Sequence, residues 1–92
     1  MVERNYRTRR GEIDLIVRNE EVLVFVEVKL RRTTRFGDPL EAVTPKKQAT
    51  LRFLAEHYLA RHQPDFDTLR FDVIGILAGR NGIRIDHVQD AF

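Results

Sequence analysis

Two pairs of charged residues at short, regular intervals are the part of this sequence that could carry chemistry. They lie in "GEIDLIVRNEEVLVFVEVKLRR", residues 11–32, where Glu12 and Asp14 belong to one apolar segment and Glu27 and Lys29 to the next. Side chains two residues apart on a β-strand point to the same face, so each pair shares a face. Clustered carboxylates repel one another unless a cation or a proton intervenes. Mg²⁺ or Mn²⁺, which prefer oxygen ligands, would relieve that repulsion.

The register between the two segments decides how these charges meet. If residues 11–17 and 22–30 pair as antiparallel strands, one register places Glu12 opposite Glu27, and a register shifted by two places Asp14 there. Either register gathers the four charged side chains on one face and leaves a core-facing apolar surface on the other. That surface would consist of Ile13, Leu15, Val17, Val22, Val24, Val26, Val28 and Leu30. The alternative to a metal site is an ion pair of the lysine with one of the acids on an exposed sheet face.

A helix is expected after these strands. Thr44 followed by Pro45 is typical of an N-cap and a first helical proline, and Pro64 ends the helical pattern. Residues 45–62 between them are therefore predicted to form one helix. Its apolar stripe at helical spacing consists of Leu51, Leu54, Ala55, Tyr58 and Leu59.

Two more strands follow the helix. Residues 69–78 become apolar on both faces, as a covered central strand does, and residues 82–88 follow a turn. A short strand is also indicated within residues 2–6. The helix between strands 22–30 and 69–78 suits a crossover connection, which makes those two strands parallel. We predict one α/β domain with a mixed sheet over residues 1–92.

Composition excludes several classes of protein. Of the 92 residues, 42% are hydrophobic and 33% charged, which is ordinary for a globular domain. The absence of cysteine excludes disulfides, zinc–thiolate sites and thiol catalysis. No apolar run approaches the ~20 residues of a membrane span, and the N-terminus lacks the apolar core of a signal peptide. We expect a cytoplasmic protein without a membrane partner.

Positive charge is concentrated in the first half of the chain. Residues 1–52 contain 12 Lys and Arg against 8 Asp and Glu, whereas residues 53–92 contain 4 against 6. Such clusters can bind a phosphate backbone, and the alternative is a solvated basic surface. The candidate nucleic-acid contacts are Arg7, Arg9, Arg10, Arg31, Arg32, Arg35, Lys46 and Lys47.

Several segments resemble those of a known family. "GEIDLI" and "VFVEVK" resemble the Asp…Glu-x-Lys signature of the PD-(D/E)XK, or restriction-endonuclease-like, nucleases. Together with "RNYRTRR", "FGDPLEAVTPKKQ", "RFDVIGI" and "HVQDAF" they are similar to the bacterial YraN family, thought to be related to Holliday junction resolvases. The similarity covers essentially the whole chain, in order and with matching spacing. It implies a restriction-endonuclease-like mixed sheet with a flanking helix, and a divalent-metal-dependent endonuclease-like activity on DNA, including branched or structured DNA.

The resemblance also implies roles for single residues. Asp14 and Glu27 would be ligands of Mg²⁺ or Mn²⁺, with the Val28 carbonyl beside them. Lys29 would position or activate the attacking water, or stabilise charge developing on phosphorus. Glu12 would join the catalytic group in a role that the motif does not define.

Two further expectations come from the resemblance. Gln48 falls where related nucleases carry a helix glutamine near the site; the alternative is a glutamine that satisfies the helix end. Family members normally begin with a helix that contributes a glutamate, and this chain starts at about the end of that helix. A sheet face would then need another cover, for which homodimerisation is one solution, and catalysis could be impaired, leaving a nucleic-acid-binding module.

Overall fold

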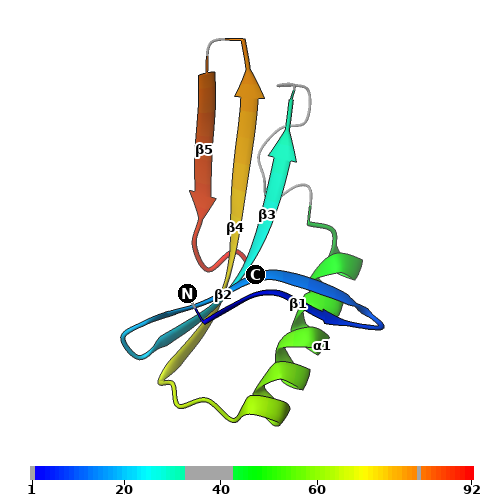
Figure 1. Ribbon diagram of the computed structural model, residues 1–92, viewed down its shortest axis with the longest axis vertical. Coiled ribbons are helices and arrows are strands. Elements are labelled where there is room, and N and C mark those ends of the chain that lie inside the picture. Colours follow the sequence, from blue (N-terminus) through cyan, green and yellow to red (C-terminus); the bar gives the residue numbers. More distant parts are fainter. Residues whose placement is uncertain (1, 33–42, 81) are drawn as a thin grey trace.

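The computed structural model describes residues 2–32, 43–80 and 82–92, and in these segments one helix packs against a five-stranded sheet (Figure 1). The order across the sheet follows the chain: β1 (Glu3–Thr8), β2 (Gly11–Asn19), β3 (Val22–Arg31), β4 (Thr68–Gly79) and β5 (Gly82–Val88). The helix, α1 (Pro45–His62), lies between β3 and β4 in the chain. These elements confirm the predicted α/β fold with a mixed sheet and a flanking helix.

The directions of the strands follow from their connections. Neighbouring strands pair antiparallel except β3 and β4, which pair parallel from Val22↔Thr68 to Arg31↔Leu77. A parallel pair needs a long crossover, and α1 lies in it. The parallel arrangement of these two strands was predicted and is confirmed. Within the described segments, no helix has the length and apolar character required to cross a membrane.

The bounds of α1 match the prediction because both ends carry capping residues. The Thr44 side chain accepts a hydrogen bond from the Lys47 amide at 3.2 Å, and Pro45 occupies the first turn. At the other end Gln63 adopts a left-handed conformation with φ 46°, and its amide donates to the Leu59 carbonyl at 2.9 Å. The helix therefore ends at His62, and Gln63 is the only residue between it and Pro64.

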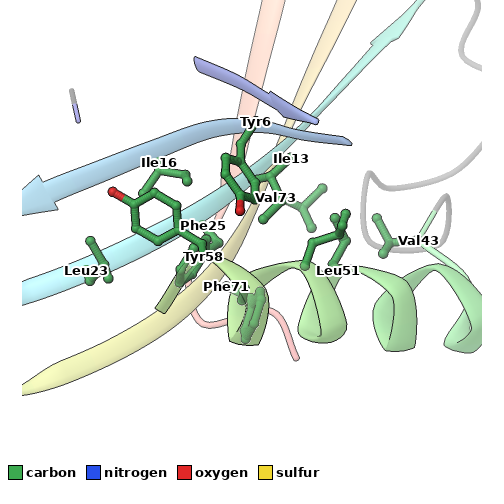
Figure 2. Packing of buried hydrophobic residues seen from close by; sticks show 12 residues of the cluster. Tyr6, Ile13, Ile16, Leu23, Phe25, Val43, Leu51, Tyr58, Phe71 and Val73 are labelled. Atoms are coloured by element: carbon green, nitrogen blue, oxygen red, sulfur yellow. The ribbon is translucent and has the colours of Figure 1, made fainter. Parts of the chain in front are cut away.

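The core lies between α1 and the sheet (Figure 2). Leu51, Leu54, Ala55 and Tyr58 are buried there, which confirms the predicted helical stripe. Tyr58 packs edge-on to Phe25 with ring centroids 5.9 Å apart. Each large apolar side chain buried in this way stabilises the fold by about 1.5–3 kcal/mol. The sheet side of the cluster consists of Tyr6, Ile13, Ile16, Leu23, Phe25, Phe71 and Val73.

The helix covers the opposite face of β3 from the one predicted. Leu23 and Phe25 point into the core beneath α1, whereas Val24 and Val26 are buried on the other face and Leu30 is 62% exposed. Both faces of β3 are apolar near its start, so alternation alone could not choose between them. The larger leucine and phenylalanine side chains fill the space under the helix. The charged face and the helix-covered face of β3 are therefore the same.

The strict alternation predicted for β2 is also wrong. Its buried side chains are Ile13 and Ile16, three positions apart, while Leu15 is only half-buried. The residue of β1 that would pair with Asp14 is Asn5, which has a positive φ of 55°. The Asn5–Asp14 pair is missing from the β1–β2 register, although the pairs on both sides of it are present. The face of β2 that is buried changes across this point, because Ile13 before it and Ile16 after it both belong to the core cluster.

The β2–β3 register is the shifted one of the two considered. Leu15 lies opposite Val26, so the register projects Asp14 toward Glu27, but the ladder ends at that Leu15–Val26 pair. Beyond it β2 leaves β3 and runs with β1 toward α1 (Figure 1). There Gly11, at φ 151°, lies beside the helix, where an added Cβ would be in ordinary van der Waals contact with the Thr50 side chain at 3.5 Å. Beside the charged residues the backbones of β2 and β3 are therefore no longer paired, and we call this unpaired stretch between them the gap.

Candidate functional site

Asp14 marks the point where the two strands separate. Its Oδ2 accepts a hydrogen bond from the Val28 amide at 2.8 Å, in place of the backbone carbonyl that a continuing β2 would supply. The amide and carbonyl of one strand residue point to the same side of the strand. The Val28 carbonyl therefore faces the same gap as the Asp14 carboxylate.

Glu27 lies inside the protein with two lysines at its outer edge. Only 5% of Glu27 is exposed. Its Oε2 lies 3.2 Å from the Lys29 Nζ and 3.7 Å from the Lys47 Nζ, and both lysine side chains are partly exposed. Lys29 comes from the same strand and Lys47 from the first turn of α1. Two elements thus bring positive charge to one buried carboxylate.

The electrostatics of Glu27 favour additional positive charge. Burial raises the pKa of the Glu27 carboxyl, and the nearby Asp14 carboxylate raises it further by repulsion and by a shared hydrogen bond. Lys29 and Lys47 act in the opposite direction, but the pKa remains above its ordinary value. The two lysines therefore do not fully compensate the two carboxylates, and a proton or a bound cation would complete the compensation.

The donor set fits a hard divalent cation. Asp14, Glu27 and the Val28 carbonyl offer oxygen atoms, which Mg²⁺ and Mn²⁺ prefer over nitrogen and sulfur. Among the described residues, no group of three or more His, Cys, Asp or Glu side chains is arranged to hold a metal. Protein ligands would thus be few, as is usual for Mg²⁺, which keeps several waters or takes phosphate oxygens.

Glu12 is directed elsewhere. Its Oε2 lies 3.2 Å from the Arg7 Nε, across the β1–β2 pair. The expected position of Glu12 beside Glu27 or Lys29 required the β2–β3 ladder to continue past Leu15, and it does not. The structure therefore places Glu12 in a β1–β2 ion pair.

Gln48 adopts the helix-end arrangement. Its Nε2 donates to the Val43 carbonyl at 3.0 Å, which ties the start of α1 to the residue before the N-cap. Gln48 follows Lys47, whose side chain reaches Glu27. The glutamine supports the helix end that carries this lysine, and no contact of its own with the carboxylates is seen in the described residues.

The residues predicted to contact phosphate do not lie together along one edge of the site. Arg10, in the β1–β2 turn, stacks over Phe53 of α1 at 4.6 Å. Arg31 ends β3, far from that turn in Figure 1, because the two strands have diverged. The β1–β2 turn and the end of β3 therefore do not lie at one edge of the site. Arg9, Arg32 and Lys46 are exposed, Arg7 pairs with Glu12, and Arg35 lies outside the described residues.

The Lys47–Glu27 contact was missed in the sequence, where Lys47 was assigned only to nucleic-acid binding. The sequence did contain a hint of this contact. Lys47 lies in the first turn of the helix capped by Thr44, and side chains on a helix tilt toward its N-terminus, in the direction of the preceding strand. The contact depends on which sheet face α1 covers, and alternation did not reveal that face.

A second buried acid has a structural arrangement. Asp72 of β4 accepts hydrogen bonds from Arg70 Nε and Nη2 at 2.9 and 3.0 Å and from the Asp90 amide at 3.0 Å. His87 Nε2 lies 2.7 Å from the same carboxylate. Burial acts to raise the pKa of Asp72, but these bonds outweigh it and hold the pKa below its ordinary value. Asp72 therefore ties β4, β5 and the C-terminal turn together.

Comparisons with known proteins identify the family. Residues 1–76 match the family described as "Uncharacterised protein family UPF0102". A UPF0102 protein of Syntrophomonas wolfei is 46% identical over 92 residues, which is 100% of this chain and 80% of the relative. One of Nitrosococcus oceani is 45% identical over 97 aligned positions, covering 100% and 75%, and one of Rhodococcus opacus is 45% identical over 93, covering 100% and 79%. The chain belongs to the UPF0102 family, which is the YraN family that its sequence resembles.

Proposed function

We propose that this protein is a divalent-metal-dependent endonuclease-like enzyme that acts on DNA, with branched or structured DNA as its substrate. The observation that carries the proposal is the meeting of Asp14 and Glu27 in the gap where β2 leaves β3, with Lys29 against Glu27. These are the residue types of the Asp…Glu-x-Lys signature. A purely structural ion pair would not need two carboxylates close enough to raise the pKa of one of them.

Each side chain has a task in this proposal. Asp14, Glu27 and the Val28 carbonyl would hold Mg²⁺ or Mn²⁺, which supplies Lewis-acid charge stabilisation to a phosphate. Lys29 donates to Glu27 from a partly exposed position, where its ammonium can also attract a phosphate oxygen and the charge developing on it. Lys47 brings a second ammonium from α1. The α1 N-terminus adds the positive end of the helix dipole to the same region.

A cleavage assay tests the proposal. Branched and linear DNA duplexes are incubated with the purified protein and Mg²⁺, Mn²⁺ or EDTA, and products are separated under denaturing conditions. We expect metal-dependent nicking that Glu27→Ala and Asp14→Ala abolish. Lys29→Met, which keeps the length of the side chain, should lower the rate by about 10²-fold or more while metal binding persists. Cleavage that survives Glu27→Ala would indicate a contaminating nuclease and overturn the assignment.

The second candidate is a nucleic-acid-binding module without catalysis. The observations in its favour are that Lys29 and Lys47 already contact Glu27, and that Glu12 pairs with Arg7 rather than with the other acids. This candidate predicts equal DNA affinity in Mg²⁺ and EDTA and no nicking in any metal. The proposed enzyme predicts nicking, and tighter binding when Ca²⁺ replaces EDTA without supporting cleavage.

A further inference from the structure

The strand β5 leaves an open sheet edge with apolar side chains beside it. Among the described residues β5 pairs with β4 alone, so one side of its backbone has no strand neighbour. Ile83 and Ile85 are 71% and 64% exposed. Proteins usually protect such an edge with charged side chains, most often lysine, with proline or with a bulge. The β5 sequence "GIRIDHV" contains no lysine or proline, and its two charged residues, Arg84 and Asp86, pair with each other at 3.0 Å.

The opposite edge of the sheet is a poorer template. Asn5 interrupts β1 with a positive φ of 55°, so the outer backbone of that strand is not continuously extended. An added strand needs an unbroken row of amides and carbonyls. Of the two edges in the described part of the sheet, β5 is the one suited to strand addition.

The hairpin fixes which groups of β5 point outward. Gly79 pairs with Gly82, leaving two residues between them, and the pair that closes such a hairpin is a hydrogen-bonded one. Hydrogen-bonded and non-hydrogen-bonded pairs then alternate along the ladder. The even-numbered residues of β5 bond to β4, so the amides and carbonyls of Ile83, Ile85 and His87 face away from the sheet.

We propose that β5 pairs antiparallel with β5 of a second copy of this chain, about a two-fold axis at Ile85. In this register Ile85 faces Ile85 of the second copy and Ile83 faces His87, which matches the outward-pointing amides and carbonyls. Arg84 then lies opposite Asp86 of the second copy, and Asp86 opposite its Arg84. The strand is therefore complementary in charge to itself, as an isologous interface requires.

Other registers are worse. A two-fold axis at Arg84 would still pair the outward-facing amides and carbonyls, Ile83 with Ile85 of the second copy, but it would place two arginines directly opposite each other. Axes at Ile83 or His87 keep the correct backbone groups but shorten the overlap and separate Arg84 from Asp86. The Ile85 axis satisfies backbone, charge and length together.

Side-chain rows across the sheet also become continuous. Leu30 lies beside Ile76, and Ile76 beside Ile85, on one face. Leu30 and Ile85 are more than 60% exposed. In the pair, the row would run from Leu30 of one copy through both Ile85 side chains to Leu30 of the other. The interface is independent of the proposed enzymatic function and buries a small area, so we infer a reversible, concentration-dependent dimer.

Sedimentation velocity of the full chain over a wide concentration range tests this inference. Ile85→Pro removes an outward amide, which an edge strand tolerates, and should leave the protein folded by circular dichroism but monomeric. Arg84→Asp and Asp86→Arg alone should each raise the dimer dissociation constant by about tenfold or more through like-charge contacts.

The decisive experiment mixes the two charge variants, Arg84→Asp and Asp86→Arg. Arg84→Asp protein can face Asp86→Arg protein with both charge pairs opposite in sign, so the mixture should form a heterodimer although neither variant dimerises well alone. The double variant Arg84→Asp/Asp86→Arg should recover the wild-type constant. A wild-type protein that is monomeric at every concentration overturns the proposal. So does a dimer that is insensitive to the proline and charge variants, because that dimer would use another surface.

Discussion

Asp14 combines a structural contact with a charge. Its Oδ2 satisfies the Val28 amide at the point where the β2–β3 ladder ends, and its repulsion helps to raise the pKa of Glu27. Alanine at this position would remove both effects and leave a partly buried amide without an acceptor. Asparagine keeps an oxygen acceptor for Val28 and removes only the charge. The Asn variant is thus the better probe of metal binding.

Metal binding should appear as thermal stabilisation. An ion that binds only the native state stabilises it by about 2.7 kcal/mol at a hundredfold excess over Kd. We expect Mn²⁺ or Mg²⁺ to raise the Tm of the wild type, and Asp14→Asn, Asp14→Ala or Glu27→Ala to abolish the shift in scanning calorimetry. Glu12→Gln serves as a control, since Glu12 pairs with Arg7, and should keep the full shift. Equal shifts in all variants would place the bound ion elsewhere.

Without metal, Glu27 should destabilise the protein as the pH rises. Because its folded pKa is raised, the folded state binds more protons than the unfolded chain, and the free energy of unfolding falls as pH increases from about 4.5 through the raised value. Glu27→Gln should remove this loss and have a higher Tm than the wild type at neutral pH in EDTA. Glu56→Gln, on the exposed side of α1, is the matched control and should change little. A lower Tm for Glu27→Gln under these conditions would contradict the electrostatic assignment.

The helix and the sheet could be predicted to different extents. The bounds of α1 and its buried stripe follow from capping residues and helical periodicity, both of which are local in sequence. The change of buried face in β2 coincides with the positive φ of Asn5 in another strand and with an Asp14 side chain that replaces a backbone acceptor. No periodicity in residues 11–17 contains this information. The proximity of Asp14 and Glu27 could be predicted, because the β2–β3 register follows from apolar burial. The position of Glu12 away from these two acids could not be predicted in this way.

The connection between β4, β5 and the C-terminal turn depends on Asp72. Removing the buried carboxylate leaves the Asp90 amide without its acceptor, while Arg70 and His87 are partly exposed, so Asp72→Ala should cost about 1–3 kcal/mol in urea unfolding. Because the folded pKa is lowered, the stability contributed by Asp72 is complete above the ordinary value of 3.8 and is lost as the pH falls through the lower folded value. Glu12→Ala, which breaks an exposed ion pair, should cost at most about 1 kcal/mol. Similar costs for the two variants would show that the Asp72 network is not stabilising.

Charge is distributed unevenly over the protein, and its effect on DNA should be separable from catalysis. Arg31 ends β3, the strand that carries Lys29, and Arg32 and Arg35 come after it in the sequence. Each phosphate neutralised contributes about 0.9 to the slope of log K against log salt for duplex DNA. The triple alanine variant should therefore bind every DNA sequence more weakly and with a flatter slope, as measured by fluorescence anisotropy in EDTA.

A matched variant separates local contacts from total charge. Arg18, Arg61 and Arg80 are exposed and lie outside both basic clusters, so replacing all three by alanine changes the net charge by the same amount. This control should retain most of the salt dependence. If both triple variants lose affinity equally, the DNA interaction is a non-specific effect of net charge rather than a surface at the end of β3.

The β3–β4 pair is the only parallel pair of the described sheet, and this parallel seam has a consequence for the order in which the elements fold. The hairpins β1–β2–β3 and β4–β5 join residues close in sequence and can form early, whereas Val22↔Thr68 must close a long loop through α1. We therefore expect this seam to limit the folding rate, with mutations such as Val73→Ala slowing folding and mutations in β5 mainly accelerating unfolding. Glu27 and Lys29 lie on one side of the seam, and Lys47 reaches Glu27 from the crossover that closes it. The three-residue charge cluster would then come together only in the last stage of folding, so partly folded chains would lack the candidate site.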